Sequence, residues 1–120
     1  MDIPYEDDHF DLAICNHVLE HIPEDTKAMK ELHRVLKSGG HAVLQVPISK
    51  NSQQTHEDFT ITDRNKREEL FGQFDHVRIY GQDYVSRLES VGFKVKRINI
   101  SEKYKKFGLN PDEDIFYCEK

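Results

Sequence analysis

The chain has 120 residues, which is enough for one domain with a single core. Its 22 acidic and 17 basic residues give a net charge of -5, which argues against nucleic-acid binding, because such surfaces need an excess of Lys and Arg. The sequence shows no apolar run near 18 residues and no charged-then-apolar leader at Met1. We therefore expect one soluble, cytoplasmic domain over residues 1–120, with no membrane span.

The most regular part of the sequence predicts a strand, a helix and a second strand in succession. Leu12–Asn16 is short, apolar and uncharged, which is typical of a strand buried on both faces of a parallel sheet. Residues 24–37 place apolar side chains along one helical stripe, and Gly39 and Gly40 are expected to end that helix. Residues 42–46 form the second strand. This order predicts a right-handed parallel crossover.

Residues 48–62 are expected to form a polar loop, residues 63–71 a helix and residues 72–81 a short strand. A second helix is expected over residues 82–91, and two closing strands over residues 93–100 and 115–119. The strand at 93–100 changes the face of its apolar side chains midway, and a bulge near Lys96-Arg97 would reconcile the two halves. Residues 101–113 are polar and show no long helical pattern. The last two strands are therefore predicted as an antiparallel pair.

The turn after the first strand contains a sequence that matches a metal motif. Residues 17–21 are His-Val-Leu-Glu-His, the H-x-x-E-H order of inverted zinc peptidases, in which two histidines bind zinc and the glutamate activates water. The candidate ligands of a zinc-dependent hydrolase would be His17, Glu20 and His21. A strand ends at Asn16 and Pro23 follows closely, so barely one helical turn is available, and no later His or Glu offers a third ligand in a clear helical context. We therefore expect no metal.

The position of the same turn suggests a second interpretation. Open parallel sheets bind ligands in the crevice just beyond the carboxyl ends of their strands. Asn16, His17 and Val18 occupy this location after the first predicted strand. The plainer alternative also stays open, in which His17 and His21 are polar groups hydrogen-bonded to nearby backbone.

A family resemblance strengthens the crevice interpretation. The residues that carry it are Phe10–Pro23, followed by Ala28-Met29, Glu31-Leu32, Arg34-Val35-Leu36-Lys37 and Gly39-Gly40. This block closely resembles the class I S-adenosylmethionine-dependent methyltransferases, in the region from their fourth strand to their fifth. The similarity continues through Asp75–Gly81, Gly92-Phe93 and Phe116-Tyr117-Cys118. It implies an α/β fold, a partial Rossmann-like methyltransferase sheet with parallel strands and a terminal antiparallel pair.

The sequence also departs from that family. In the family, a first strand ends in a glycine-rich turn that approaches the cofactor, and an acidic residue after the second strand holds its ribose. The six glycines of this chain include no G-x-G, and no predicted strand precedes Phe10. The resemblance thus implies the carboxyl-terminal half of a methyltransferase-like fold that lacks the first three strands. We expect the chain alone to bind cofactor weakly or not at all.

The resemblance implies S-adenosylmethionine as cofactor and methyl transfer to an unidentified, small-molecule acceptor. Such a transfer rests mainly on alignment and desolvation, so no single catalytic residue is assigned. The residues expected beside the methionine end of the cofactor are Asn16, His17, Val18 and His21. The candidate substrate-binding residues, from the polar loop and the segment after it, are His56, His76, Arg78 and Tyr80. A salt bridge for Arg78 and core packing for Tyr80 are the alternatives.

The resemblance also bears on partners. The fourth strand of the family pairs with the first at the centre of the sheet, so Leu12–Asn16 is expected at an open edge. This strand carries no charge or proline to discourage pairing, and contiguous exposed apolar surface usually marks an interface. We expect a homo-oligomer such as a dimer, or a complementing chain, through this strand. A non-catalytic interaction or dimerisation module derived from a methyltransferase is therefore the alternative function.

Overall fold

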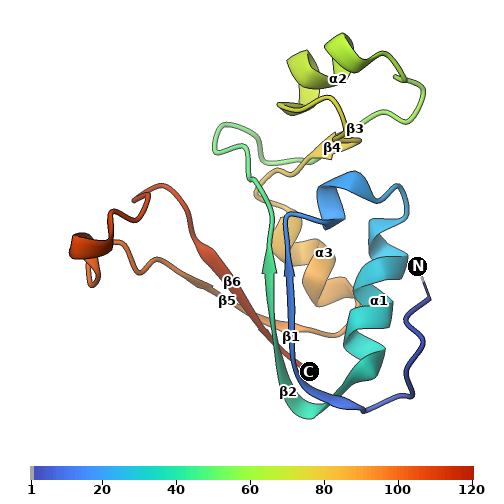
Figure 1. The fold of residues 1–120 in the computed structure, drawn as a ribbon, viewed down its shortest axis with the longest axis vertical. Helices are drawn as coiled ribbons and strands as arrows, with labels where there is room; N and C mark the ends of the chain where they lie inside the picture. Colours follow the sequence, from blue (N-terminus) through green and yellow to red (C-terminus); the bar gives the residue numbers. More distant parts are fainter. Residues whose placement is uncertain (1) are drawn as a thin grey trace.

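A mixed four-stranded sheet forms the centre of the structure, a computed structural model that describes residues 2–120 (Figure 1). The strands, in spatial order, are β1 (Phe10–Asn16), β2 (Leu36–Gln45), β6 (Ile115–Glu119) and β5 (Lys94–Ile98). β1 and β2 are parallel, whereas β6 runs antiparallel to both of its neighbours. The predicted α/β class, the parallel pair and the closing antiparallel pair are thus confirmed.

Three helices and a small second sheet complete the fold. The helices are α1 (Asp25–Val35), α2 (Arg64–Phe71) and α3 (Tyr84–Ser90), and the 3₁₀ turns are η1 (Leu19–His21) and η2 (Lys105–Phe107). Strands β3 (His56–Glu57) and β4 (Arg78–Ile79) pair with each other and lie beside α2, at the end of the molecule beyond η1 (Figure 1). Within residues 2–120, every helix is too short or too polar to cross a membrane.

The junction of α1 and β2 differs from the sequence-based expectation. The helix ends at Val35, and β2 begins at Leu36, before the two glycines that were expected to end the helix. The β1–β2 register shifts between its first two pairs, so the glycines lie in an irregular part of β2. A Cβ on Gly40 would lie 2.8 Å from the Lys37 carbonyl oxygen, and Gly39 has a φ of +79°. Gly40 therefore permits a close backbone approach inside the strand and Gly39 a left-handed backbone conformation, rather than a helix cap.

The core lies on one face of the sheet. The buried stripe of α1 and the inner side of α3 pack against alternate residues of β2 and β6, including Leu44 and Phe116. Leu12 and Ile14 of β1 are 54% and 66% exposed. The expectation that the first strand is buried on both faces is therefore wrong for this chain, because β1 is an edge strand and α1 packs on one side only.

The predicted bulge in the fifth strand is also wrong. The β5–β6 register continues without a break from Lys94 opposite Glu119 to Ile98 opposite Ile115. Ile98 is 37% exposed, so the strand tolerates this side chain outside the core. Regular pairing is retained, and the change of apolar face needs no inserted residue.

Candidate functional site

The candidate site begins where β1 ends. His17 has a φ of +55°, a left-handed conformation that is uncommon for residues other than glycine and is often found at functional turns. Its backbone N–H donates to the Gln45 carbonyl at 2.8 Å, which fixes the turn against the end of β2. The His17 side chain stays 55% exposed. The structure thus holds His17 open to solvent at the carboxyl ends of two parallel strands.

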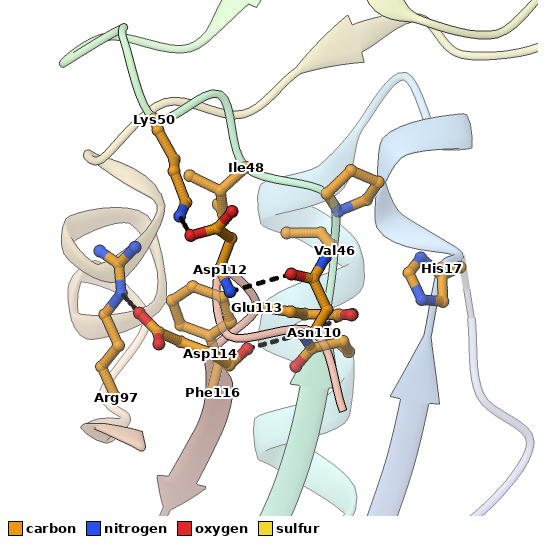
Figure 2. Close-up of a pocket in the computed structure, with 12 residues that line it drawn as sticks. His17, Val46, Ile48, Lys50, Arg97, Asn110, Asp112, Glu113, Asp114 and Phe116 are labelled. Atoms are coloured by element: carbon orange, nitrogen blue, oxygen red, sulfur yellow. Dashed lines mark hydrogen bonds and ion pairs between the residues drawn. The ribbon is translucent and has the colours of Figure 1, made fainter. Parts of the chain in front are cut away.

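A pocket of about 370 Å³ lies beside His17, at the carboxyl end of β2 (Figure 2). His17 stands at one side of this pocket, and two ion pairs line the other (Figure 2). Lys50 Nζ lies 2.6 Å from Asp112 Oδ1, and Arg97 Nε lies 2.6 Å from Asp114 Oδ2. We call this space the β2 pocket.

The charges of the β2 pocket are held in place by hydrogen bonds. Burial raises the pKa of Asp114, but hydrogen bonds from Arg97 and Asn99 outweigh burial and hold the pKa below its usual value. Gln45 Nε2 donates to the Asp114 carbonyl at 2.6 Å. Gln45 Oε1, in contrast, is buried and has no hydrogen-bond partner within residues 2–120. The Gln45 side chain thus lines the pocket with one of its polar atoms paired and the other buried.

A second pocket, of about 330 Å³, lies on the other side of Gln45. Asn16 and His17 line it together with Val43 and Ile115, and we call it the edge pocket. Residues 109–110 and 113 of the loop between β5 and β6 line both this space and, in part, the β2 pocket. The structure therefore brings Asn16 and His17 together at a concave surface, in the location expected from the sheet.

The other two predicted cofactor residues lie differently. Val18 is 38% exposed at the start of the η1 turn. His21 instead contacts the segment before β4, where its Nδ1 lies 3.2 Å from the Asp75 carbonyl and its ring packs edge-on against His76. His21 is not among the described residues that line the β2 pocket or the edge pocket.

The predicted substrate-binding residues are spread over the far end of the molecule. His56 is exposed on β3, at a separate pocket of about 440 Å³ that Ile61 and Leu70 also line. His76 is buried, and its Nδ1 lies 3.0 Å from the Phe71 carbonyl. Neither histidine lines the β2 pocket or the edge pocket in the described chain.

Arg78 and Tyr80 are fully buried, and their polar groups are engaged inside the chain. The Arg78 guanidinium donates to the Leu19 carbonyl at 2.7 Å and to the Pro23 carbonyl at 2.8 Å. The Tyr80 hydroxyl donates to Asp25 Oδ2 at 2.7 Å, and burial together with the Asp25 charge raises the pKa of Tyr80. This placement fits the alternatives stated above, a salt bridge and core packing.

Within the motif at residues 17–21, only Leu19–His21 form a 3₁₀ turn, and the regular helix that a zinc peptidase needs is not formed. Glu20 and His21 do meet a further histidine, His76, whose distance in the sequence hid it from pattern analysis. Potential metal-ligand atoms of these three residues all lie within 4.8 Å of one another.

Sequence reasoning missed the polar lining of the β2 pocket. Lys50 belongs to the long loop, and Asp112 and Asp114 belong to the polar segment before the last strand. The length and polarity of residues 101–113 marked this segment as unusual. Its return over the end of β2 is a tertiary feature that sequence patterns do not record.

Comparison with known proteins bears on the fold. Residues 1–44 match the family described as "Methyltransferase domain". Demethylmenaquinone methyltransferase of Staphylococcus carnosus is 36% identical over 67 residues, which cover 51% of this chain and 28% of that protein. A second relative, 2-phytyl-1,4-naphtoquinone methyltransferase of Synechococcus elongatus, is 24% identical over 106 residues, which cover 78% of this chain and 46% of that protein. The chain thus spans less than half of the length of both relatives.

Two solved structures share the architecture. The [4+2]-cyclase SpnF aligns with a TM-score of 0.65 and 16% identity, over 99% of this chain and 53% of that chain. An S-adenosylmethionine-dependent methyltransferase from Mesorhizobium loti aligns with a TM-score of 0.58 and 17% identity, over 100% of this chain and 65% of that chain. At this identity the two structures show the fold alone. Together with the family match, they establish that this chain has the fold of the class I S-adenosylmethionine-dependent methyltransferases.

Proposed function

We propose that this chain acts in S-adenosylmethionine-dependent methyl transfer to a small-molecule acceptor, with Asn16, His17 and Val18 as one wall of the cofactor site. The observation that carries the proposal is the exposed, left-handed turn at the carboxyl end of β1, which lies inside the segment matched to the methyltransferase family. Open α/β sheets bind ligands at this location.

The residues at the turn fit the methionine end of such a cofactor. The Asn16 amide, which lines the edge pocket, offers both a donor and an acceptor. When bound, the cofactor would supply an electrophilic methyl group on its sulfonium sulfur. The acceptor's electron pair would form a bond to the methyl carbon while the carbon–sulfur bond breaks, which leaves a neutral thioether. The role of this chain is to align the two molecules and to exclude water.

The β2 pocket is the proposed acceptor site. It lies on the side of His17 toward β2 and β6. In the methyltransferase family, the glycine-rich turn that approaches the cofactor lies on the other side, across the edge that is free in β1. Lys50 and Arg97 offer donors, and Asp112 and Asp114 offer acceptors. This lining suits a small polar acceptor with groups of both kinds.

Calorimetric titration with S-adenosylhomocysteine tests the cofactor site. We expect weak binding to the unaltered chain, with a dissociation constant just below about 1 mM, equivalent to about -4 kcal/mol. His17→Ala should weaken binding by about tenfold, the loss of one polar contact worth about 1.4 kcal/mol. His41→Ala is the matched control, since His41 also lies on the sheet but outside the described lining of both pockets. Absence of heat up to that concentration would contradict cofactor binding by this chain.

The alternative function is a non-catalytic interaction module. The exposed apolar side chains of Leu12 and Ile14, on the edge strand, favour it independently of the pockets. A chain that associates through β1 and gives no heat with S-adenosylhomocysteine would support this alternative.

A further inference from the structure

Glu20 is a buried carboxylate without adequate compensation. Its side chain is 2% exposed, and its Oε2 has no hydrogen-bond partner within residues 2–120. Three imidazole nitrogens surround Oε1, with His17 Nδ1 at 3.6 Å, His21 Nε2 at 3.8 Å and His76 Nε2 at 3.9 Å. These distances exceed those of hydrogen bonds. Desolvating a charged carboxylate in this way is unfavourable unless a cation binds it.

The hydrogen bonds of His21 and His76 define which of their nitrogens carries a proton. His76 Nδ1 lies 3.0 Å from the Phe71 carbonyl, and His21 Nδ1 lies 3.2 Å from the Asp75 carbonyl. A carbonyl only accepts, so Nδ1 of each ring is the donor, and Nε2 is the nitrogen left to bind a metal ion. Both Nε2 atoms are the ones nearest to Glu20. An Nδ1–H donated to a backbone carbonyl is also the usual support of a histidine that binds metal through Nε2.

The backbone holds the two halves of this cluster together. The Val77 N–H donates to the Glu20 carbonyl at 3.0 Å, directly beside His76. The buried Arg78 guanidinium donates to the Leu19 carbonyl at 2.7 Å. The η1 turn and the segment before β4 are therefore fixed relative to each other before any ligand binds.

We propose that Glu20, His21 and His76 form a binding site for a divalent transition metal ion, with Zn²⁺ as the best match. Two imidazole nitrogens and one carboxylate oxygen are a ligand set that zinc prefers, with a fourth position left open. Calcium and magnesium prefer sites made of oxygen atoms. The proposal differs from the H-x-x-E-H hydrolase motif, because His76 replaces His17 as a ligand.

Metal binding requires the ligand side chains to move closer together, from a spread of up to 4.8 Å. A tetrahedral zinc ion with ligands at about 2.0–2.1 Å holds ligand atoms roughly 3.3–3.4 Å apart. The present separations between Oε1 and the two Nε2 atoms are 3.8 and 3.9 Å. His21 is 30% exposed, which gives an ion access from solvent. His17 Nδ1, 3.6 Å from Oε1 on a half-exposed side chain, lies near enough to contact a ligand in the open position.

Zinc binding is measured on the chelator-treated chain by calorimetry, and Co²⁺ is used as a spectroscopic probe. We expect one ion per chain, visible absorption bands of four-coordinate cobalt, and a higher Tm with zinc, because the ion binds the folded state only. Neither measurement involves S-adenosylmethionine, so the result does not depend on the proposed methyl transfer.

Two ligand variants and one control decide the assignment. His76→Gln and His21→Gln should each weaken zinc affinity by at least about 100-fold, more than the loss of an outer-shell partner. His41→Gln, on a partly exposed histidine of β2, should leave affinity unchanged. His21 is partly exposed, so its variant keeps the test valid if His76→Gln fails to fold. No binding to the unaltered chain, or an affinity in both ligand variants equal to that of the unaltered chain, would overturn the proposal.

Discussion

Glu57 forms ion pairs with two arginine side chains. Its carboxylate lies 2.9 Å from Arg78 Nε and 3.0 Å from Arg87 Nη2. Burial raises the pKa of Glu57, but hydrogen bonds from Arg87 and Arg78 outweigh burial, so the pKa lies below its usual value. A carboxyl with a lowered pKa in the folded state contributes stability above its unfolded pKa. That contribution is lost as the pH falls through the folded pKa.

Glu57→Gln should therefore reduce stability in a pH-dependent way. At pH 7 we expect the free energy of unfolding to fall by about 1 kcal/mol, as for a partly exposed ion pair. The difference from the unaltered chain should shrink as the pH drops below about 4.3, the pKa of Glu in unfolded chains. Urea unfolding at a series of pH values measures both effects.

The control for this prediction is Glu69→Gln. Glu69 is exposed on α2, and it forms no ion pair in the described part of the chain. Its variant should change the free energy of unfolding by less than about 0.5 kcal/mol at every pH. A Glu57→Gln deficit that stays constant down to pH 2 would contradict the assigned role of the ion pairs.

At the scale of secondary-structure elements, Arg78 joins β4 to the η1 turn. Its guanidinium is fully buried and donates to the carbonyls of Leu19, Ile22 and Pro23. The Leu19 carbonyl lies in the 3₁₀ turn, where it also accepts from the Ile22 N–H, and the other two carbonyls lie between that turn and α1. Arg78 supplies the donors that the turn needs.

Arg78→Lys should destabilise the fold despite retaining the charge. A lysine ammonium cannot reproduce the planar fork that reaches several carbonyls and Glu57 at once. We expect the free energy of unfolding to fall by about 3 kcal/mol, because buried partners are left unpaired. Urea unfolding with chelator present measures the change. Arg64→Lys, on an exposed arginine of α2, should cost less than about 0.5 kcal/mol, and an equal loss in both variants would refute the role of Arg78.

The elements themselves were largely readable in the sequence. The helical stripe of residues 24–37 and the apolar runs of β1, β2 and β6 follow directly from side-chain periodicity. The end of α1 was misplaced because glycine is also suited to a left-handed residue, as at Gly39, and to a close backbone approach, as at Gly40, within a strand. A glycine pair marks unusual backbone, and the sequence alone does not say which kind.

The candidate site was predictable only in part. Asn16 and His17 were expected at the strand end because the sheet type defines where ligands bind. The meeting of Glu20 with His76 depends on how the segment before β4 folds back on η1. The β2 pocket likewise depends on the return of the loop between β5 and β6. Such contacts between distant segments leave no periodic signal in either one.

At the scale of the whole molecule, the sheet has two unlike faces. One face carries α1 and α3 and contains the core. On the other, Leu12 and Ile14 are exposed, and the register places Ile14 beside Val43 and Val43 beside Tyr117. β1 also lies at the edge of the sheet, where its outer backbone groups have no neighbouring strand within residues 2–120. Edge and face together form an apolar surface suited to pairing.

Ile14→Lys should weaken self-association through this surface. We expect the unaltered chain to show a mass above that of the monomer, rising with concentration, in size-exclusion chromatography with light scattering. Burying one large aliphatic side chain contributes about 1.5 kcal/mol or more, so its loss should raise the dissociation constant at least about tenfold. Phe107→Lys is the control, because Phe107 is 64% exposed but lies on η2, away from β1. A monomer at all concentrations would count against the interface. An equal loss of self-association in both variants would show general hydrophobic association, because only contact through the sheet depends on Ile14 and not on Phe107.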